Sequence, residues 1–173
     1  LHNLSHELDD TRLTAIRRCD FCKDIVDVYS PSIWAGWYRG IYTDYKNVSY
    51  HEMQQVDHFL HVEWGGDNHA GRYAEDPYVN LDKIEGSEAK ADERAGDWSE
   101  SYITDLIDWH LKEQETMPWL TGAAYWPFKD FSTPVRPINP VPYMNQKGVV
   151  ERDFTKKEAY YVFQSYWTEK PMA

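Results

Sequence analysis

The sequence has few cysteines, few positive charges and no long hydrophobic run. No apolar stretch approaches the roughly 20 residues that span a bilayer, and the segment from Leu1 to Leu4 lacks the basic and apolar regions of a signal peptide. Eighteen lysines and arginines against 29 aspartates and glutamates give a formal net charge of −11. That charge repels phosphate backbones and anionic membranes, so we expect no nucleic-acid or membrane partner. The chain is expected to be soluble, and its cellular location stays open.

Cysteine occurs only at Cys19 and Cys22. This C-x-x-C spacing fits a redox pair, half of a zinc site, or two reduced structural thiols. The sequence has no second thiol pair, and the surrounding residues do not resemble a thioredoxin-like strand-to-helix start. Reduced structural thiols are therefore favoured. No loop has calcium-binding spacing, so neither a metal nor a cofactor is predicted.

Aromatic residues are abundant, with 8 Trp, 13 Tyr and 6 Phe among 173 residues. The length and the 42% hydrophobic content are those of one globular unit. Flat amphipathic rings fill cores, and they also line grooves that bind sugars.

Hydrophobic periodicity and capping signals predict alternating strands and helices. Helices are expected over residues 1–8, from the capping box Ser49–Glu52 to about His58, from Ser99 to about Met117, and after the capping box Thr155–Glu158. Strands are expected over residues 13–16, 24–30, 59–63 and 121–126. The mixed-charge segment 82–97 is predicted to be a solvated loop, and the proline-rich segment 132–144 a rigid irregular one.

Short apolar strands alternating with helices are typical of an α/β fold with a parallel sheet. Four strands are half of a β/α barrel, which needs eight. An open doubly wound sheet is the alternative, but no glycine-rich phosphate loop follows any of the four strands.

Glu63 is the first candidate functional residue, because it ends an apolar strand and precedes Trp64 and two glycines. A carboxylate placed there is either functional or neutralised by a nearby Arg or Lys. Asp67 and His69 either bind a hydroxyl-rich ligand or cap the loop. His61 shares the strand face of Glu63 by period two, and is either a contact of Glu63 or a hydrogen-bonded core histidine.

Trp126 ends the fourth strand, where it is either core filler or the floor of a sugar subsite. Asn145 and Lys147 follow the proline-rich loop. They either build a turn at Gly148 or donate hydrogen bonds to an anionic or hydroxylated substrate.

The order of these motifs resembles the C-terminal half of the catalytic barrel of glycoside hydrolase family 2, the family of β-galactosidases, β-glucuronidases and β-mannosidases. The resemblance rests on blocks that cover nearly the whole chain: Asp10–Thr14, Val26–Val28 with Gly36–Tyr38, His61–Asp67, Tyr125–Phe131, Asn145–Gly148, and Arg152–Asp153 leading into Lys157–Tyr160.

The resemblance implies strands five to eight of a β/α barrel in a retaining exo-glycosidase that uses two carboxylates. Glu63 falls on the family's nucleophile position and Trp126 on an aromatic residue of the sugar subsite. Asn145 and Lys147 fall on the Asn-x-Lys pair that reads the substrate carboxylate in glucuronidases, although similar residues occur in galactosidase-like members.

Two departures from the family pattern stand out. Trp34 falls nearest the position of a Tyr that usually hydrogen-bonds the nucleophile, and an indole donates but cannot act as a phenol does. The family's acid/base follows an Asn, and this sequence has no Asn-Glu dipeptide. The acid/base is therefore expected upstream of Leu1, and the isolated chain is expected to be inactive.

The resemblance also suggests a domain plan. Residues 1–168 are expected to form the C-terminal half of the barrel, and residues 169–173 to begin a linker. The expected intramolecular partners are the N-terminal half of the barrel and flanking β-sandwich domains of a longer protein. A β-galactosidase acting on terminal β-galactosyl residues is the leading prediction. The alternatives are a β-glucuronidase and a non-catalytic carbohydrate-binding barrel.

Overall fold

The computed structural model describes residues 1–75 and 98–170. The predicted loop 82–97 lies outside the described residues, as do the last three residues of the predicted linker. The elements are α1 (His2–Leu8), β1 (Ala15–Arg17), η1 (Asp20–Cys22), β2 (Val28–Ser30), η2 (Tyr42–Asp44), α2 (Tyr45–Met53), β3 (Phe59–Trp64), α3 (Glu100–Gln114), β4 (Leu120–Tyr125), β5 (Phe131–Ser132), β6 (Met144–Asn145) and α4 (Glu158–Glu169).

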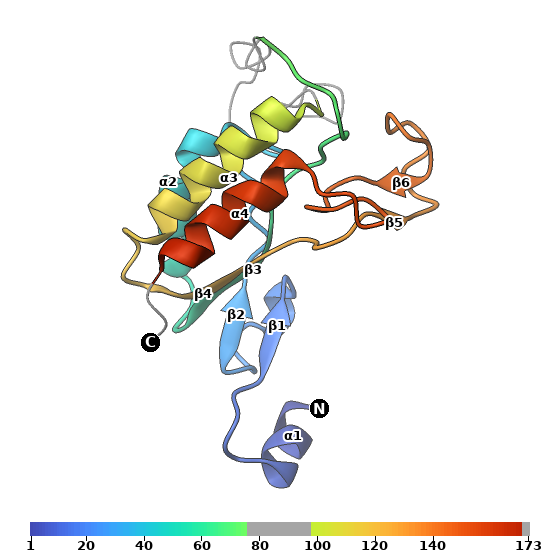
Figure 1. The fold of residues 1–173 in the computed structure, drawn as a ribbon. Helices are drawn as coiled ribbons and strands as arrows, with labels where there is room; N and C mark the ends of the chain where they lie inside the picture. The colour runs from blue at the N-terminus through green and yellow to red at the C-terminus, as the bar shows by residue number, and fades with distance from the viewer. Residues whose placement is uncertain (76–97, 171–173) are drawn as a thin grey trace.

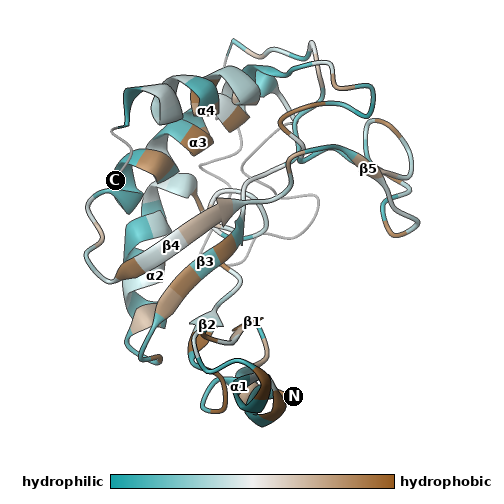
Figure 2. Cartoon of the chain, turned by 60° about the horizontal axis from the view of Figure 1, so that its bottom comes forward, coloured by the Kyte–Doolittle hydropathy of each residue, from teal (hydrophilic) through white to brown (hydrophobic). Residues whose placement is uncertain are grey.

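A four-stranded parallel sheet in the order β1-β2-β3-β4 organises the chain. Three helices, α2, α3 and α4, lie on the same side of β3 and β4 (Figures 1 and 2). A doubly wound sheet has helices on both faces, whereas sequential strands with helices on one face are the winding of a β/α barrel. The predicted α/β class with a parallel sheet is confirmed, and the partial barrel stays a prediction.

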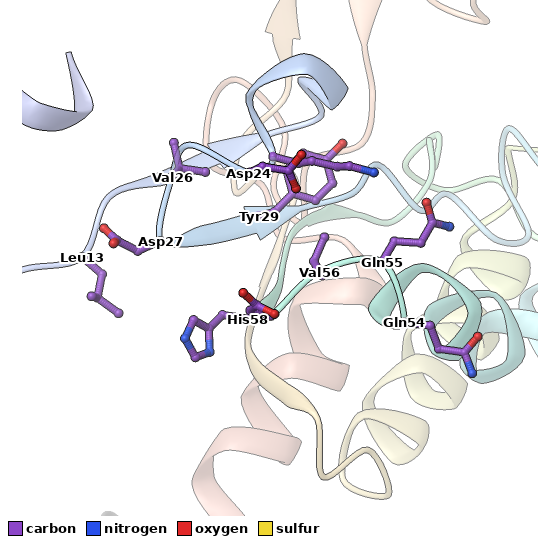
Figure 3. Close-up of a pocket in the computed structure, with 11 residues that line it drawn as sticks. Leu13, Asp24, Val26, Asp27, Tyr29, Gln54, Gln55, Val56 and His58 are labelled. Carbon is purple, nitrogen blue, oxygen red and sulfur yellow. The ribbon is translucent and has the colours of Figure 1, made fainter.

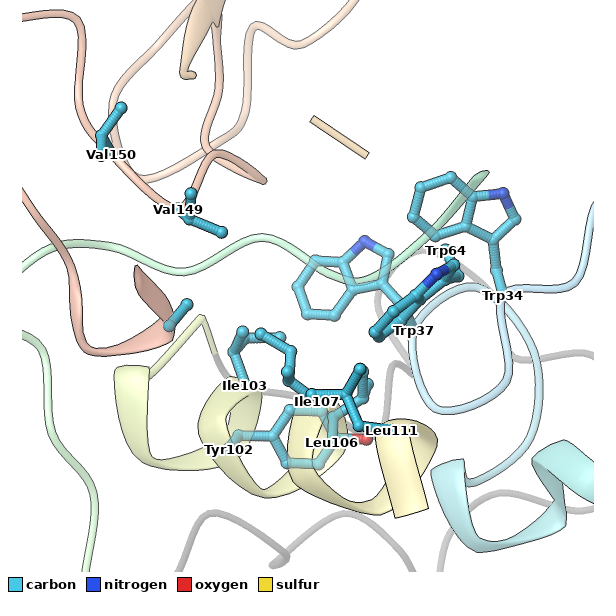
Figure 4. Packing of buried hydrophobic residues seen from close by; sticks show 11 residues of the cluster. Trp34, Trp37, Trp64, Tyr102, Ile103, Leu106, Ile107, Leu111, Val149 and Val150 are labelled. Carbon is cyan, nitrogen blue, oxygen red and sulfur yellow. The ribbon is translucent and has the colours of Figure 1, made fainter. Parts of the chain in front are cut away.

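The main hydrophobic core lies between the sheet and α3. Tyr102, Ile103, Leu106, Ile107 and Leu111 form one buried face of α3, as the sequence periodicity predicts. They pack with Trp37, Trp64, Val149 and Val150, and Figure 4 shows the indoles gathered above the helix. The predicted cap is confirmed, because the Ser99 side chain accepts a hydrogen bond from the backbone N–H of Tyr102.

Both predicted capping boxes are wrong. The second helix begins at Tyr45, and Ser49 is fully buried inside it, so packing of Tyr45 against the core extends the helix past the local signal. The last helix has Lys157 as its N-cap, with no side-chain cap of its own. Its first N–H, from Glu158, donates instead to Oε2 of Glu100 on α3, at 2.5 Å. A tertiary contact thus replaces the local cap.

Smaller differences concern strand ends and exposure. The first two strands are three residues each and begin later than predicted, with Leu13 exposed to solvent. The proline-rich loop is closed by an antiparallel pair, β5 with β6. Trp167 on α4 is 61% exposed, although it belongs to an apolar series of residues along the helix. Cys19 and Cys22 are free, as predicted. None of the described helices is long and apolar enough to cross a membrane.

Candidate active site

Glu63 is displaced from the regular strand pattern by a β-bulge. His61 and Trp64 of β3 pair with Ala123 and Tyr125 of β4, so β3 carries one extra residue between these two pairs. His61 and Trp64 are both buried. A bulge re-aims the side chain that it contains, and here it separates Glu63 from the two buried residues that pack toward the helices.

Arg17 is the direct partner of Glu63. Its Nε lies 2.5 Å from Glu63 Oε2. The same guanidinium donates through Nη2 to Ser32 Oγ at 2.8 Å, and Trp34 Nε1 donates to that hydroxyl at 3.0 Å. Trp34, which falls at the family's Tyr position, thus reaches the carboxylate through Ser32 and Arg17.

Electrostatics at Glu63 combine burial with two positive charges. Its side chain is 20% exposed. Burial raises the pKa of Glu63 above its usual value, and the charges of Arg17 and Lys147 act in the opposite direction. Burial therefore favours the protonated carboxyl group, and the two positive charges favour the carboxylate.

Asp67 and Lys147 form a buried ion pair beside this site. Lys147 Nζ lies 2.5 Å from Asp67 Oδ2, and both side chains are at most 2% exposed. Asp67 Oδ1 also accepts from the backbone N–H of Gln146 at 2.8 Å. Asp67 therefore anchors the loop that carries Lys147, which agrees with the structural alternative for this residue.

Aromatic rings surround the Lys147 ammonium. Its Nζ lies 5.7, 5.7 and 5.0 Å from the ring centroids of Trp34, Trp37 and Tyr38, within the range of cation–π attraction. Asn145 Oδ1 accepts from the backbone N–H of Lys147 at 3.1 Å, so the two residues of the Asn-x-Lys pair form one turn.

A second buried ion pair, Asp130 with Lys157, contacts the residues on either side of Lys147. Lys157 Nζ lies 2.9 Å from both carboxylate oxygens of Asp130, and it also donates to the backbone oxygens of Asn68 and Gln146. Asp130 Oδ1 accepts from the N–H of Gly148 at 2.8 Å. Burial raises the pKa of Asp130 to about 6, although Lys157 acts in the opposite direction. The loops after β3 and β4 are therefore joined through Lys157.

Trp126 and His69 lie at the edge of the site. Trp126 follows β4, is 42% exposed, and packs edge-on against Phe131. Its side chain is thus partly open to solvent, unlike that of the buried Trp34. His69 Nδ1 lies 2.8 Å from Gln146 Nε2, so this histidine also supports the Lys147 loop.

His61 is a hydrogen-bonded core histidine, and the hydrogen bonds of its ring go to groups other than the Glu63 carboxylate. Its Nε2 lies 3.0 Å from the Ile33 carbonyl oxygen, and its Nδ1 lies 2.7 Å from the Tyr45 hydroxyl. A neutral ring satisfies both, donating to the carbonyl and accepting from the phenol. Burial lowers the pKa of His61 to about 4.

Sequence reasoning did not find Arg17, Ser32, Asp130 or Lys157. A charged residue at the end of an apolar strand was the signal that selected Glu63, and Arg17 at the end of β1 carries the same signal. The other three residues have no such mark, since their roles depend on partners distant in the chain. Within the described residues, a group of His, Cys, Asp or Glu side chains suited to a metal ion occurs only at α1, and it does not include Glu63.

The chain is similar over nearly its whole length to several known proteins. The β-glucuronidase of Parabacteroides merdae is 72% identical over 99% of this chain, with a TM-score of 0.90. Bacteroides uniformis β-glucuronidase 3 is 59% identical over 99% of the chain, with a TM-score of 0.84. A candidate β-glucuronidase of Formosa agariphila is 46% identical over 99% of the chain. No family model matches the chain.

These similarities place the chain among the relatives of glycosidases. More narrowly, it is a relative of the β-glucuronidases of glycoside hydrolase family 2. It spans only 23%, 22% and 22% of the three relatives named above. Because these relatives are β-glucuronidases, they favour that alternative over the predicted β-galactosidase.

Proposed function

We propose that this chain carries the nucleophile and part of the sugar site of a retaining β-glucuronidase. In this proposal residues 1–168 form strands five to eight of a β/α barrel, and residues 169–173 begin a linker. The observation that carries it is the ion pair of Glu63 with Arg17 at the carboxyl ends of parallel strands, with the charge of Lys147 acting on the same carboxyl group, in a chain 72% identical to a β-glucuronidase.

Glu63 is the proposed nucleophile. Its carboxylate oxygen attacks the anomeric carbon while the bond from that carbon to the leaving-group oxygen breaks. A second carboxyl group, proposed to lie in another segment of the whole protein, donates a proton to the leaving oxygen. Water then attacks the glycosyl ester with help from the same second group, which releases the sugar and restores Glu63.

Arg17 is a proposed positioning residue for this step. Its positive charge favours the ionised carboxylate that the attack requires. Burial acts the other way because it disfavours the charged form, so the charge of Arg17 also stabilises the carboxylate that leaves when the glycosyl ester is hydrolysed. Ser32 accepts a hydrogen bond from the guanidinium, and Trp34 donates a hydrogen bond to Ser32.

Lys147 and Asn145 are the proposed readers of the glucuronide carboxylate. An ammonium group has three N–H donors, and Asp67 takes only one of them. Trp126 offers its exposed face to the C–H groups of the sugar ring. Asp67, His69 and Trp34 are proposed to position this turn and the nucleophile without touching the sugar.

The test uses the whole natural protein that contains this sequence. It is treated separately with 2-deoxy-2-fluoro glucuronyl fluoride and with the galactosyl analogue, and peptide mass mapping locates the label. We expect the glucuronyl reagent alone to label Glu63, with no label in Glu63→Gln. Galactosyl labelling of Glu63 would restore the β-galactosidase reading. Absence of label from both, in a folded protein, would favour a non-catalytic sugar-binding barrel.

A further inference from the structure

The first helix is joined to the sheet by polar side chains. None of the residues of α1 is buried, and Leu4 and Leu8 are exposed. On the side that faces the sheet, His2 Nδ1 lies 2.8 Å from Thr14 Oγ1, and His6 Nε2 lies 2.8 Å from Asp27 Oδ2. Two imidazoles thus make side-chain hydrogen bonds from this helix to residues next to the strands β1 and β2.

We propose that His2, His6 and Asp27 form a Zn²⁺ site that joins α1 to the sheet. Each residue offers one ligand atom, and these three atoms lie within 4.8 Å of one another. Histidines four residues apart project from one face of a helix, the spacing by which helices chelate zinc. The two rings lie 4.8 Å apart between centroids.

The donor set matches the chemistry of zinc. Two imidazole nitrogens and one carboxylate are ordinary Zn²⁺ ligands, and three protein ligands leave a fourth tetrahedral position for water. Zinc–ligand bonds of roughly 2.0–2.2 Å separate neighbouring ligand atoms by about 3.3 Å. Small rotations of the three side chains are enough to reach that separation, since His6 and Asp27 must open from 2.8 Å.

Asp27 is prepared for a cation. The N–H and hydroxyl of Thr14 donate to its Oδ2 at 2.8 and 2.9 Å, and His6 reaches the same atom. In the described part of the chain all these bonds end on Oδ2, so Oδ1 keeps its lone pairs for a metal. The bonds from Thr14 and His6 also hold the pKa of Asp27 far below its usual value. The carboxylate is therefore ionised at neutral pH, and Thr14 serves as the outer support that metal ligands usually have.

The site has an entry path. Asp27 lies on the wall of a cavity of about 550 Å³ that Tyr29, Val56 and His58 also line (Figure 3). The side chains of His6 and Asp27 are 30% and 26% exposed. An ion can thus reach the ligands from solvent without unfolding of the sheet.

The test measures zinc binding by the whole natural protein after removal of metals with a chelator. Cys19 and Cys22 are competing ligands, so all variants carry Cys19→Ser and Cys22→Ser. Titration calorimetry follows Zn²⁺, and Co²⁺ gives the visible absorption of a tetrahedral site. The test variants are His2→Ala, His6→Ala and Asp27→Asn, and the matched control is the exposed helical histidine variant His51→Ala.

We expect each test variant to bind one equivalent of zinc fewer than the parent, or to lose more zinc affinity than the roughly 10–100-fold that loss of an outer support causes. The control is expected to match the thiol-free parent. Zinc is also expected to raise the melting temperature of the parent and the control, and not that of His6→Ala. Equal binding by parent and all three variants would overturn the proposal. Because Asp27→Asn keeps an acceptor for Thr14, it remains informative if a histidine variant fails to fold.

Discussion

Arg17 and Glu63 meet across an intervening strand. Arg17 ends β1, Glu63 lies near the end of β3, and β2 lies between them, yet Nε and Oε2 are 2.5 Å apart. Ser30, the β2 residue paired with Arg17, is small and accepts a hydrogen bond from the Val62 N–H. A larger side chain at this position would block the contact, so three strands cooperate to place one ion pair.

Replacement of Arg17 is expected to shift the acid limb of the pH profile. In Arg17→Gln the carboxylate of Glu63 loses one of its two opposing charges and keeps only that of Lys147, so burial weighs more and the pKa of Glu63 rises further. Since only the ionised form attacks, the acid limb of kcat/KM moves to higher pH. The measurement is the pH–rate profile of the whole protein on an aryl glucuronide. Arg12→Gln, at an exposed arginine paired with Asp9, is the control. An unshifted limb would exclude a role for Arg17 in ionising Glu63.

Lys147 is expected to govern glucuronide specificity. Lys147→Met removes a charged hydrogen bond worth roughly 1.5–3 kcal/mol, so kcat/KM on aryl glucuronides is expected to fall about 10–100-fold. Residual activity on aryl galactosides is expected to fall less.

A double variant separates this effect from misfolding. Lys147→Met alone leaves Asp67 charged and buried without its ion-pair partner, whereas adding Asp67→Asn removes that charge. We expect the double variant to regain stability in urea and to remain poor on glucuronides. Equal losses on both sugars in this variant would contradict carboxylate recognition by Lys147.

Lys157 is expected to be a large contributor to stability. Lys157→Met removes hydrogen bonds to Asn68 and Gln146 and leaves Asp130 buried without its charge partner. Breaking one side of a buried pair costs about 3–5 kcal/mol. The neighbouring Lys156→Met, at an exposed site, should stay within about 0.5 kcal/mol. Urea unfolding of both proteins provides the comparison, and similar stabilities would show that the ion pair of Lys157 with Asp130 contributes little.

Two buried histidines are expected to make the fold acid-sensitive. Burial lowers the pKa of His61 to about 4 and that of His110 to about 3, whereas an unfolded His titrates near 6.5. Between these values the unfolded chain binds more protons, so stability falls as pH falls below about 6.5. Each histidine contributes about 1.4 kcal/mol per pH unit over that window.

Substitution of one of these histidines tests that sign. His110→Phe retains a ring to stack on Trp64 and Tyr45 but cannot titrate. Its free energy of unfolding should depend less steeply on pH between 4 and 6.5 than that of the parent, while His51→Gln should not differ. A steeper dependence in His110→Phe would refute the assignment.

The sequence predicted what local patterns determine. Ser99 caps the third helix as predicted, because the cap and the apolar face depend on residues that are close together in the sequence. The start of the second helix was missed, because burial of Tyr45 outweighs a capping signal at Ser49. The burial of Tyr45 depends on contacts with distant parts of the chain, which the spacing of neighbouring residues does not predict.

Site residues divide in the same way. Glu63 could be selected because a charge at the end of an apolar strand is unusual. Arg17 carries the same signal, but its pairing with Glu63 could not be predicted, because the pairing of β1 and β3 residues depends on the sheet order. The sequence could not choose the glycone, for which the relatives favour the glucuronidase alternative, because Asn-x-Lys is a short motif whose meaning depends on the pocket around it. The role of Glu63 itself stays a prediction.

The bulge in β3 places the candidate nucleophile Glu63 between two residues of the buried core. The bulge lies between His61 and Trp64, and the hydrogen bonds and ring contacts of these two buried side chains do not include the Glu63 carboxylate. Evolution and engineering can therefore change residue 63 while the core contacts of the strand persist. Glu63→Gln should give a folded protein without a nucleophile, the form best suited to holding an intact substrate for crystallography.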